Sequence, residues 1–400
     1  MQKYKHILIA FTLTFIFLIA TTLTWLYSQI NGALPQLEGQ QTLLGLSNSA
    51  KIDRDAQGIV TITANNRQDI ALATGFVHAQ ERFFQMDLQR KKSAGELSSL
   101  IGPATLAYDK KIRQPRFRER ARKIVAQLPK QEYQLLKAYT QGVNQGLNNL
   151  KAPPFEYLLL QQDPVEWQEE DSILTILTIY ITLQSPDGKR ELSLAAIKKQ
   201  LGEPIYQLLN PPGSQWDATI DNSQFDSPKL PDLTWLDKLL PNHSPQLTNI
   251  PIEENNFPGS NSWAISGKLN HDGRAIIAND MHLTLTVPNI WFRAAFHYQQ
   301  NKTKIKITGL TLPGTPNMIV GSNSYIAWGF TNSYGDWSDV IILDTNADNS
   351  QYLTPDGYLA FTSKTQIIAV KGQAPVEITI KETIWGPVIG TDKQGKLLAY

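Results

Sequence analysis

The chain has 400 residues, 42% of them hydrophobic and 18% charged, which is a globular composition and enough length for one large or two ordinary domains. Its formal net charge of +1 gives no indication of a nucleic-acid partner, since general nucleic-acid binders carry a strong basic excess. The sequence has no cysteine, which excludes disulfides, thiolate catalysis and cysteine metal sites. Exported proteins can also avoid cysteine, so this count does not identify the compartment.

A long apolar run lies near the N-terminus. Two lysines and a histidine precede Ile7–Tyr27, which is uncharged and mostly apolar. About 20 such residues span a bilayer, whereas the core of a cleaved signal peptide usually has about 7–15. No clear small-x-small cleavage site follows, and leading basic residues favour a cytoplasmic N-terminus. We expect residues 1–33 to be a membrane anchor, with a cleaved signal segment as the alternative, and the rest of the chain to be periplasmic or otherwise exported.

Residues 34–210 are predicted to be mainly helical. Val60–Thr63 alternates as a half-buried strand does, and Asn65 or Asn66 can cap a helix that runs to about Gly95. His78 lies on this helix among apolar neighbours, where a lone histidine is expected to be a hydrogen-bonded core residue rather than a ligand. Residues 112–150 are predicted to be strongly helical, with a basic part at 113–122 and an amphipathic part at 130–150, and further helices are predicted over residues 170–183 and 191–209.

The character of the sequence changes after residue 210. Residues 211–259 are polar and rich in scattered prolines, which indicates a linker or a spacer propeptide. Residues 260–400 are β-rich, with turns at Asn270–Gly273 and Pro355–Gly357. Strands are predicted over residues 263–266, 275–278, 304–308, 318–320, 326–328, 340–343, 366–370 and 376–380.

The border between these two regions is the Gly259–Ser260 bond. Gly259 offers an unhindered carbonyl, and the Ser260 hydroxyl can attack it. Cleavage would leave Ser260 as a new N-terminus whose α-amine, with a pKa of about 7.7–8.0, can serve as the serine's own base. A turn that simply enters a strand explains the same residues, so this stretch alone leaves both interpretations open.

Other catalytic mechanisms lack their motifs. The sequence has no His-Glu-x-x-His zinc motif, no phosphate-binding Gly-x-x-x-x-Gly-Lys-Ser/Thr loop and no Gly-x-Ser-x-Gly elbow. Its six histidines are mostly isolated, which makes a histidine metal cluster a poor explanation. Ser260 therefore remains the leading candidate nucleophile.

Several separated segments together resemble the penicillin acylase family of N-terminal-nucleophile hydrolases, which includes cephalosporin and acyl-homoserine-lactone acylases. The similarity runs from about residue 34 to residue 400, and it depends on the order and spacing of the motifs rather than on any single one. The matching segments are Ile52–Ile59, Gly75–Asp87, Gly259–Trp263, Asn279–Leu283, Leu312–Pro316 and Ala327–Asn332.

The resemblance implies an α+β chain of the αββα sandwich type, made as a zymogen and cut by itself at Gly259–Ser260. Ser260 would then hydrolyse the linear amide of a small acyl-amide substrate, such as a penicillin or an acyl-homoserine lactone, which would relate it to antibiotic production or quorum quenching. His282 falls where the family has a histidine or glutamine beside the nucleophile. Asn332 falls where the family uses a main-chain N–H as an oxyanion donor. No organic cofactor is implied.

The resemblance also implies a structural calcium site that ties the two pieces together after cleavage. Asp336 and Asp339, with the Ser338 carbonyl, match a family calcium loop, and Glu191 matches a ligand from the first piece. Hard oxygen ligands of this kind suit calcium. Taken alone, an Asp-x-x-Asp sequence is usually a solvated loop.

The C-terminal part departs from the family pattern. The chain reaches only Tyr400, whereas the family's second piece continues to an oxyanion asparagine, an arginine near the site and further calcium ligands. We interpret residues 260–400 as the start of an incomplete second piece, truncated at its C-terminus. The alternative is a membrane-anchored, non-catalytic binding protein or pseudoenzyme that retains the acylase fold.

Overall fold

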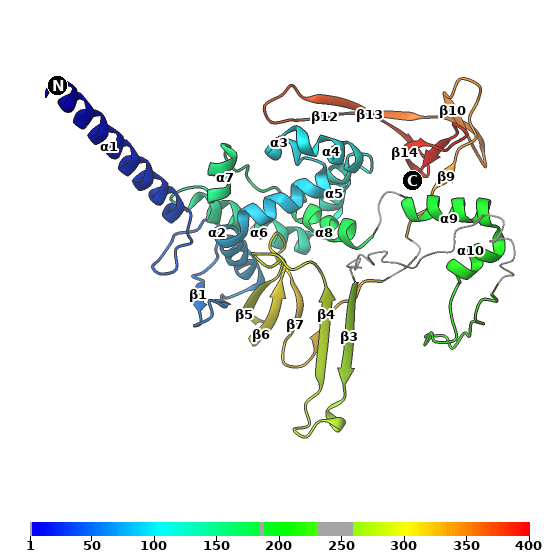
Figure 1. The fold of residues 1–400 in the computed structure, drawn as a ribbon. Helices are drawn as coiled ribbons and strands as arrows, with labels where there is room; N and C mark the ends of the chain where they lie inside the picture. Colours follow the sequence, from blue (N-terminus) through cyan, green and yellow to red (C-terminus); the bar gives the residue numbers. More distant parts are fainter. Residues whose placement is uncertain (1, 185–187, 231–258, 334, 336) are drawn as a thin grey trace, which may run out of the picture. The chain divides into compact units, whose positions relative to one another are not determined.

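The computed structural model describes residues 2–184, 188–230, 259–333, 335 and 337–400 (Figure 1). The chain divides into two compact units that do not follow chain order. The first unit consists of Met1–Leu183, Pro258–Ser333 and Thr365–Thr379, and the second consists of Gln184–Phe257, Tyr334–Lys364 and Ile380–Tyr400. Most of the predicted spacer, residues 231–258, lies outside the described residues, and its first part, residues 211–230, contains no helix or strand.

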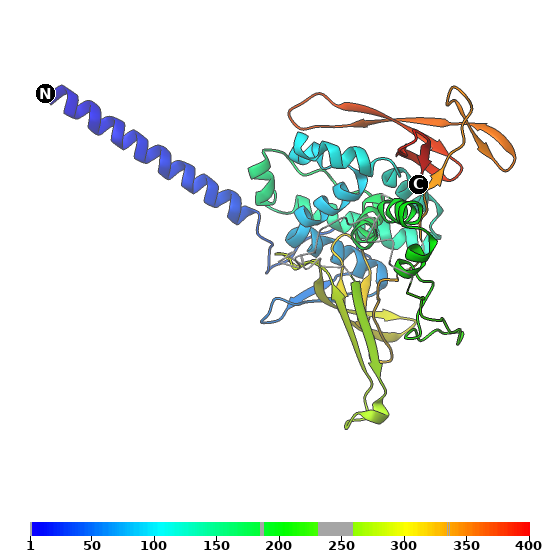
Figure 2. The same cartoon turned by 45° about the vertical axis from the view of Figure 1, so that its right-hand side comes forward.

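The apolar N-terminal run forms one long helix, α1 (Gln2–Gly32), which both views show as a single extended rod (Figures 1 and 2). Tyr4–Gly32 is the single helix of the described residues that is long and apolar enough to cross a membrane, a test that a signal sequence also passes. The end of α1 is tied to the first unit, because the Ala152 N–H donates to the Gly32 carbonyl at 3.1 Å.

The first unit contains a six-stranded sheet built from distant parts of the chain. Its order is β1-β2-β5-β6-β7-β8, and β2 pairs with β5 in parallel while the other pairs are antiparallel. In the β2–β5 register, Val60 lies opposite Ala294 and Ile62 opposite Phe296, so the N-terminal segment joins the sheet through buried residues. The strands are β1 (Lys51–Arg54), β2 (Val60–Thr63), β5 (Phe292–Gln300), β6 (Thr303–Thr311), β7 (Met318–Ser322) and β8 (Ala327–Trp328).

Helix α2 (Arg67–Ala94) packs on this sheet, and α6 (Lys130–Asn148) packs closely on α2. The Asn66 side chain accepts from the Asp69 N–H and caps α2, while Gly95 ends it with φ 65°. The two helices meet through glycines: a Cβ at Gly142 would lie 1.9 Å from the Leu72 carbonyl oxygen. Their backbones therefore approach more closely than any larger residue allows.

His78 lies fully buried where α2, α6 and β6 meet, as expected for a hydrogen-bonded core histidine. Its Nδ1 lies 2.9 Å from the Tyr139 hydroxyl and its Nε2 lies 2.9 Å from Thr311 Oγ1. Thr311 donates its own proton to the Phe292 carbonyl, so it must accept from His78 Nε2–H. The imidazole is therefore the neutral Nε2–H tautomer, with Nδ1 accepting from Tyr139.

The remaining helices of the first unit surround a buried ion network. Arg90 pairs with Asp87 at 2.7 Å and Asp171 at 2.6 Å, and the Tyr157 hydroxyl donates to Asp87 at 2.7 Å. Burial alone would lower the pKa of Arg90, but the charges of Asp171 and Asp87 raise it. Arg90 is therefore charged, and its two carboxylate partners compensate for its burial. These helices are α3 (Ser98–Ile101), α4 (Leu106–Ile112), α5 (Phe117–Gln127), α7 (Phe155–Leu160) and α8 (Glu169–Leu183), with a 3₁₀ turn at Pro103–Thr105.

A separate two-stranded antiparallel sheet carries the Gly259–Ser260 bond. It pairs β3 (Gly259–Ile265) with β4 (Ile276–His282) along their whole length, from Gly259 opposite His282 to Ile265 opposite Ile276. A 3₁₀ turn at Gly267–Leu269 and Gly273, with φ 72°, close this hairpin.

The second unit contains two helices and several short antiparallel strands. α9 (Lys189–Leu201) and α10 (Glu203–Leu209) are separated by Gly202 with φ 84°, so the prediction of one helix over 191–209 is wrong at this glycine. A hairpin pairs β10 with β11, and β9, β14 and β15 belong to a sheet with the order β12-β13-β14-β15-β9, in which β12 and β13 have residues in both units. The bounds are β9 (Ile341–Ile342), β10 (Gln351–Thr354), β11 (Gly357–Ala360), β12 (Thr362–Ile368), β13 (Val376–Thr383), β14 (Gly386–Thr391) and β15 (Leu397–Ala399).

Candidate active site

Ser260 lies near the start of β3, directly after the predicted point of cleavage. Gly259 is buried and Ser260 is half-buried. The β3–β4 register places Gly259 opposite His282 and Ser260 opposite Met281. The backbone at the end of β4 therefore lies beside the Gly259–Ser260 bond.

The Ser260 hydroxyl has a backbone partner from a segment far away in the sequence. The Asn332 N–H donates to Ser260 Oγ at 2.6 Å. Asn332 follows β8 on the last edge of the six-stranded sheet, so this contact joins the hairpin to that sheet. Ser260 and Asn332 are 72 residues apart in the sequence, and both were predicted to belong to one site. The structure brings them into contact.

Asn279 of β4 holds this arrangement and was not predicted as a site residue. Its Nδ2 donates to the Asn261 carbonyl at 3.2 Å and to the Phe330 carbonyl at 3.0 Å, and its Oδ1 accepts from the Phe330 N–H at 3.3 Å. A Cβ at Gly329 would lie 2.8 Å from this amide. The sequence did contain a signal for this contact: Asn279 and Gly329 lie in two of the segments that resemble the acylase family, 279–283 and 327–332.

The His282 ring contacts a residue of its own strand. Its Nε2 lies 3.0 Å from Asp280 Oδ2, and both side chains are largely exposed to solvent. Its backbone, in contrast, pairs with Gly259. Among the described contacts, His282 therefore reaches the Gly259–Ser260 bond through its main chain.

The predicted calcium ligands are only partly described. Asp336 lies outside the described residues. The Glu191 carboxylate pairs with Arg190 at 3.2 Å, and Asp339 Oδ1 accepts from the Val340 N–H at 2.7 Å. Within the described ranges, no three His, Asp or Glu side chains gather as a metal site would require. The calcium site, with Ser338 as its carbonyl ligand, stays a prediction.

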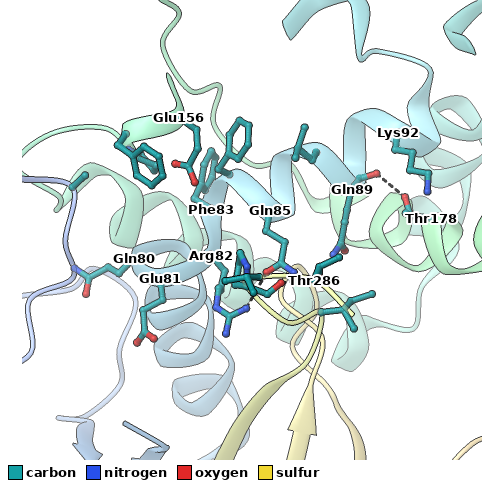
Figure 3. A pocket seen from close by; sticks show the side chains of 18 of the residues that line it. Gln80, Glu81, Arg82, Phe83, Gln85, Gln89, Lys92, Glu156, Thr178 and Thr286 are labelled. Atoms are coloured by element: carbon teal, nitrogen blue, oxygen red, sulfur yellow. Dashed lines mark hydrogen bonds between the residues drawn. The ribbon is translucent and has the colours of Figure 1, made fainter. Parts of the chain in front are cut away.

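The first unit contains a large pocket (Figure 3), and its lining includes Leu283, the residue that follows His282 in the sequence. Its volume is about 900 Å³, and its walls come from α2, α7, α8, residues 283–290 and the end of α1. Arg82 and Gln85 lie together with Thr286 on one wall, where both side chains donate to the Asn289 carbonyl. Burial lowers the pKa of Arg82, but its hydrogen bonds to Asn289 and Gln85 keep its charge solvated.

Comparison with known proteins identifies the family. The profile described as "Penicillin amidase" matches residues 49–400. The chain belongs to the penicillin amidase family. It is 25% identical over 379 residues to the acyl-homoserine lactone acylase QuiP of Pseudomonas aeruginosa, covering 92% of this chain and 43% of that protein. It is 29% identical over 373 residues to the penicillin acylase 2 proenzyme of Pseudomonas sp. strain SE83, covering 91% and 46%.

The match to these relatives covers less than half of their length. A solved structure of the thermostable penicillin G acylase from Alcaligenes faecalis is 23% identical and covers 43% of this chain and 95% of the compared chain, with a TM-score of 0.38. Family membership therefore derives from the sequence match over residues 49–400.

Proposed function

We propose that this protein is a self-processing acylase that hydrolyses a linear amide through an acyl-enzyme on Ser260. The observation that carries the proposal is the 2.6 Å hydrogen bond from the Asn332 N–H to Ser260 Oγ. A main-chain donor beside a serine at a Gly-Ser junction is the arrangement that acyl transfer needs, because an oxyanion forms within reach of that N–H.

In maturation, Ser260 Oγ attacks the Gly259 carbonyl and the peptide C–N bond breaks, which transfers the Gly259 acyl group from nitrogen to oxygen. Water then hydrolyses this ester, giving a Gly259 carboxylate and a free Ser260 α-amine. The pairing of Gly259 with His282 holds the scissile carbonyl in place. The amide of Asn279 keeps the Asn332 segment against the hairpin.

In turnover, the Ser260 α-amine takes the hydroxyl proton as Oγ attacks the substrate carbonyl, and it returns a proton to the leaving amine. The Asn332 N–H then donates to the tetrahedral oxyanion. Removal of one such donor typically costs about 2.7–4 kcal/mol of transition-state stabilisation. Water releases the acid from the serine ester and regenerates the enzyme.

The names of the relatives support two substrate classes for this site, acyl-homoserine lactones and penicillins. We further propose that α1 anchors the protein in the membrane with the enzymatic part on the exported side, since Tyr4–Gly32 contains an apolar window of 18 residues that is not buried inside the protein. We also propose that the protein has the αββα layering of N-terminal-nucleophile hydrolases and that a calcium ion stabilises it after cleavage.

Amide hydrolysis by the whole gene product tests the role of Ser260. Ser260→Ala is expected to lose about a thousandfold or more in kcat/KM, as nucleophile removal does elsewhere. Ser262→Ala is the matched control: it lies on the same strand and donates only to the Ala278 carbonyl at 3.1 Å, so its activity should stay within about threefold. Retained hydrolysis in Ser260→Ala would exclude this serine as the nucleophile.

A further inference from the structure

The end of the proposed membrane anchor is joined directly to the body of the first unit. Gly32, the last residue of α1, is buried, and its carbonyl accepts from the Ala152 N–H at 3.1 Å. A Cβ at Gly32 would lie 3.0 Å from the Ala152 Cβ and 3.4 Å from the Lys151 Cβ, so the two segments are in close contact. Ala152 lies just before α7, which Figure 1 shows beside the end of α1. A bilayer that contains α1 therefore has α7 next to the point where α1 leaves it.

The length of the apolar run sets the depth of this contact. Ile7–Tyr27 has 21 residues. At 1.5 Å per residue they span about 31 Å, which matches a hydrocarbon core of about 30 Å. Trp25 and Tyr27 are exposed at the end of this run, where aromatic residues are typical of a membrane interface.

Gly32 lies only a short way beyond that interface. It follows Tyr27 by five positions, so the two residues are about 7.5 Å apart along the helix axis. The headgroup layer on each side of a bilayer is about 5–7.5 Å thick. The body of the first unit therefore begins at the outer boundary of the headgroups.

Helix α7 presents an apolar face at this level. Tyr157 is buried and its hydroxyl donates to Asp87 at 2.7 Å, which fixes the orientation of the helix. Phe155 is 49% exposed and Leu159 is 76% exposed, and residues four positions apart lie on one face of a helix. Lys151, which is exposed beside the end of α1, offers an ammonium group to a lipid phosphate.

We propose that α7 is a second membrane contact, in which Phe155 and Leu159 insert among the headgroups of the bilayer that holds α1. The inference rests on the membrane anchor of the proposed function and adds that the first unit lies against the bilayer surface. The apolar face is continuous with the anchor, because Phe155 lines one cavity together with Ile30 and Leu34, which are themselves exposed. Lipid is the occupant that this continuity favours, since a partly buried apolar face beside a spanning helix is how proteins lie in an interface.

Fluorescence quenching of the full-length protein in phosphatidylcholine vesicles tests the proposal. The sequence has no cysteine, so Leu159→Cys takes a maleimide fluorophore at one position. The vesicles contain a lipid with a nitroxide near the top of its acyl chain. We expect the nitroxide to quench the Leu159→Cys label at least threefold more strongly than a label on Leu269→Cys.

Leu269 is the matched control because it is also an exposed leucine of the first unit, at 83%, in the turn that closes the β3–β4 hairpin. Both views place this turn away from α1 (Figures 1 and 2). A label on Phe15→Cys, in the middle of α1, reports whether the anchor has inserted. A quenched Phe15→Cys label with equal quenching at Leu159→Cys and Leu269→Cys would overturn this inference and leave the anchor intact. An unquenched Phe15→Cys label would contradict the anchor and this inference with it.

A charge on the apolar face gives a second test. Phe155→Glu in the Leu159→Cys protein should lower the quenching at least twofold, because a carboxylate is poorly tolerated among lipid chains. Ile124→Glu, at a 41% exposed position of α5, should leave it unchanged. Equal thermal midpoints confirm that both variants fold. Quenching that ignores Phe155→Glu would show that this face is not held in the bilayer.

Discussion

His78, on α2, contacts α6 and the sheet through its two ring nitrogens. The stability of the first unit should therefore depend on the protonation state of this ring. Burial, with a smaller contribution from the Arg82 charge, lowers the pKa of His78 to about 3. A proton on Nδ1 would leave no acceptor for the Tyr139 hydroxyl. The neutral ring is therefore the form that holds α2, α6 and β6 together.

The pH dependence of stability should report this histidine. Between about pH 6.5 and pH 3 the unfolded imidazole is protonated and the folded one is not, so the unfolded state binds one more proton. The free energy of unfolding should fall by about 1.4 kcal/mol per pH unit on acidification through this window, from this group alone. Urea unfolding at pH 6 and pH 4.5 measures the slope.

The substitution His78→Gln isolates that contribution, since glutamine offers a donor and an acceptor but does not titrate here. The variant should be less stable at neutral pH and should show a pH slope that is smaller by about 1.4 kcal/mol per unit. Equal slopes in the two proteins would show that His78 is not the titrating group.

At the scale of elements, patterns within one segment predicted the structure well. The helix with its Asn66 cap and its end at Gly95, the alternating strand at 60–63 and the turn at 270–273 are all confirmed. β5 was missed, although Phe292, Ala294, Phe296 and Tyr298 alternate as buried residues along it. Its parallel pairing with β2 is a contact between distant segments that local periodicity does not contain.

The site shows the same division between local and distant information. Ser260 could be named as a candidate from its own neighbours, because it follows a glycine at a change of structure, but the family resemblance was needed to choose cleavage over a simple turn. The contact of Asn332 with Ser260 came from the family resemblance and not from spacing. Asn279 was not assigned because its role depends on hydrogen bonds to two other segments, which exist only after β4 and residues 329–332 meet.

The predicted calcium site consists of residues 336–339 and Glu191. If calcium binds there, a chelator should lower the thermal midpoint of the wild type by several degrees, since a ligand that binds only the folded state stabilises it. Asp339→Ala should remove this dependence, whereas Asp348→Ala, in an exposed loop bound to Ser350, should retain it. A midpoint that ignores calcium in the wild type would exclude the site.

At the scale of the whole molecule, both compact units contain residues from before and after Gly259–Ser260. The parallel β2–β5 pairing and the His78–Thr311 hydrogen bond both join the two sides within the first unit. A cut at this bond therefore leaves both pieces held by the sheet and the core, so cleavage is compatible with a folded product.

The mass of the purified full chain after incubation at pH 7–8 tests the central claim most directly. The account predicts cleavage at one bond, with a second fragment whose N-terminal sequence begins Ser260-Asn261-Ser262-Trp263, and an uncut chain in Ser260→Ala under the same conditions. An intact Gly259–Ser260 bond in the wild type, or cleavage of that bond that persists in Ser260→Ala, would contradict it.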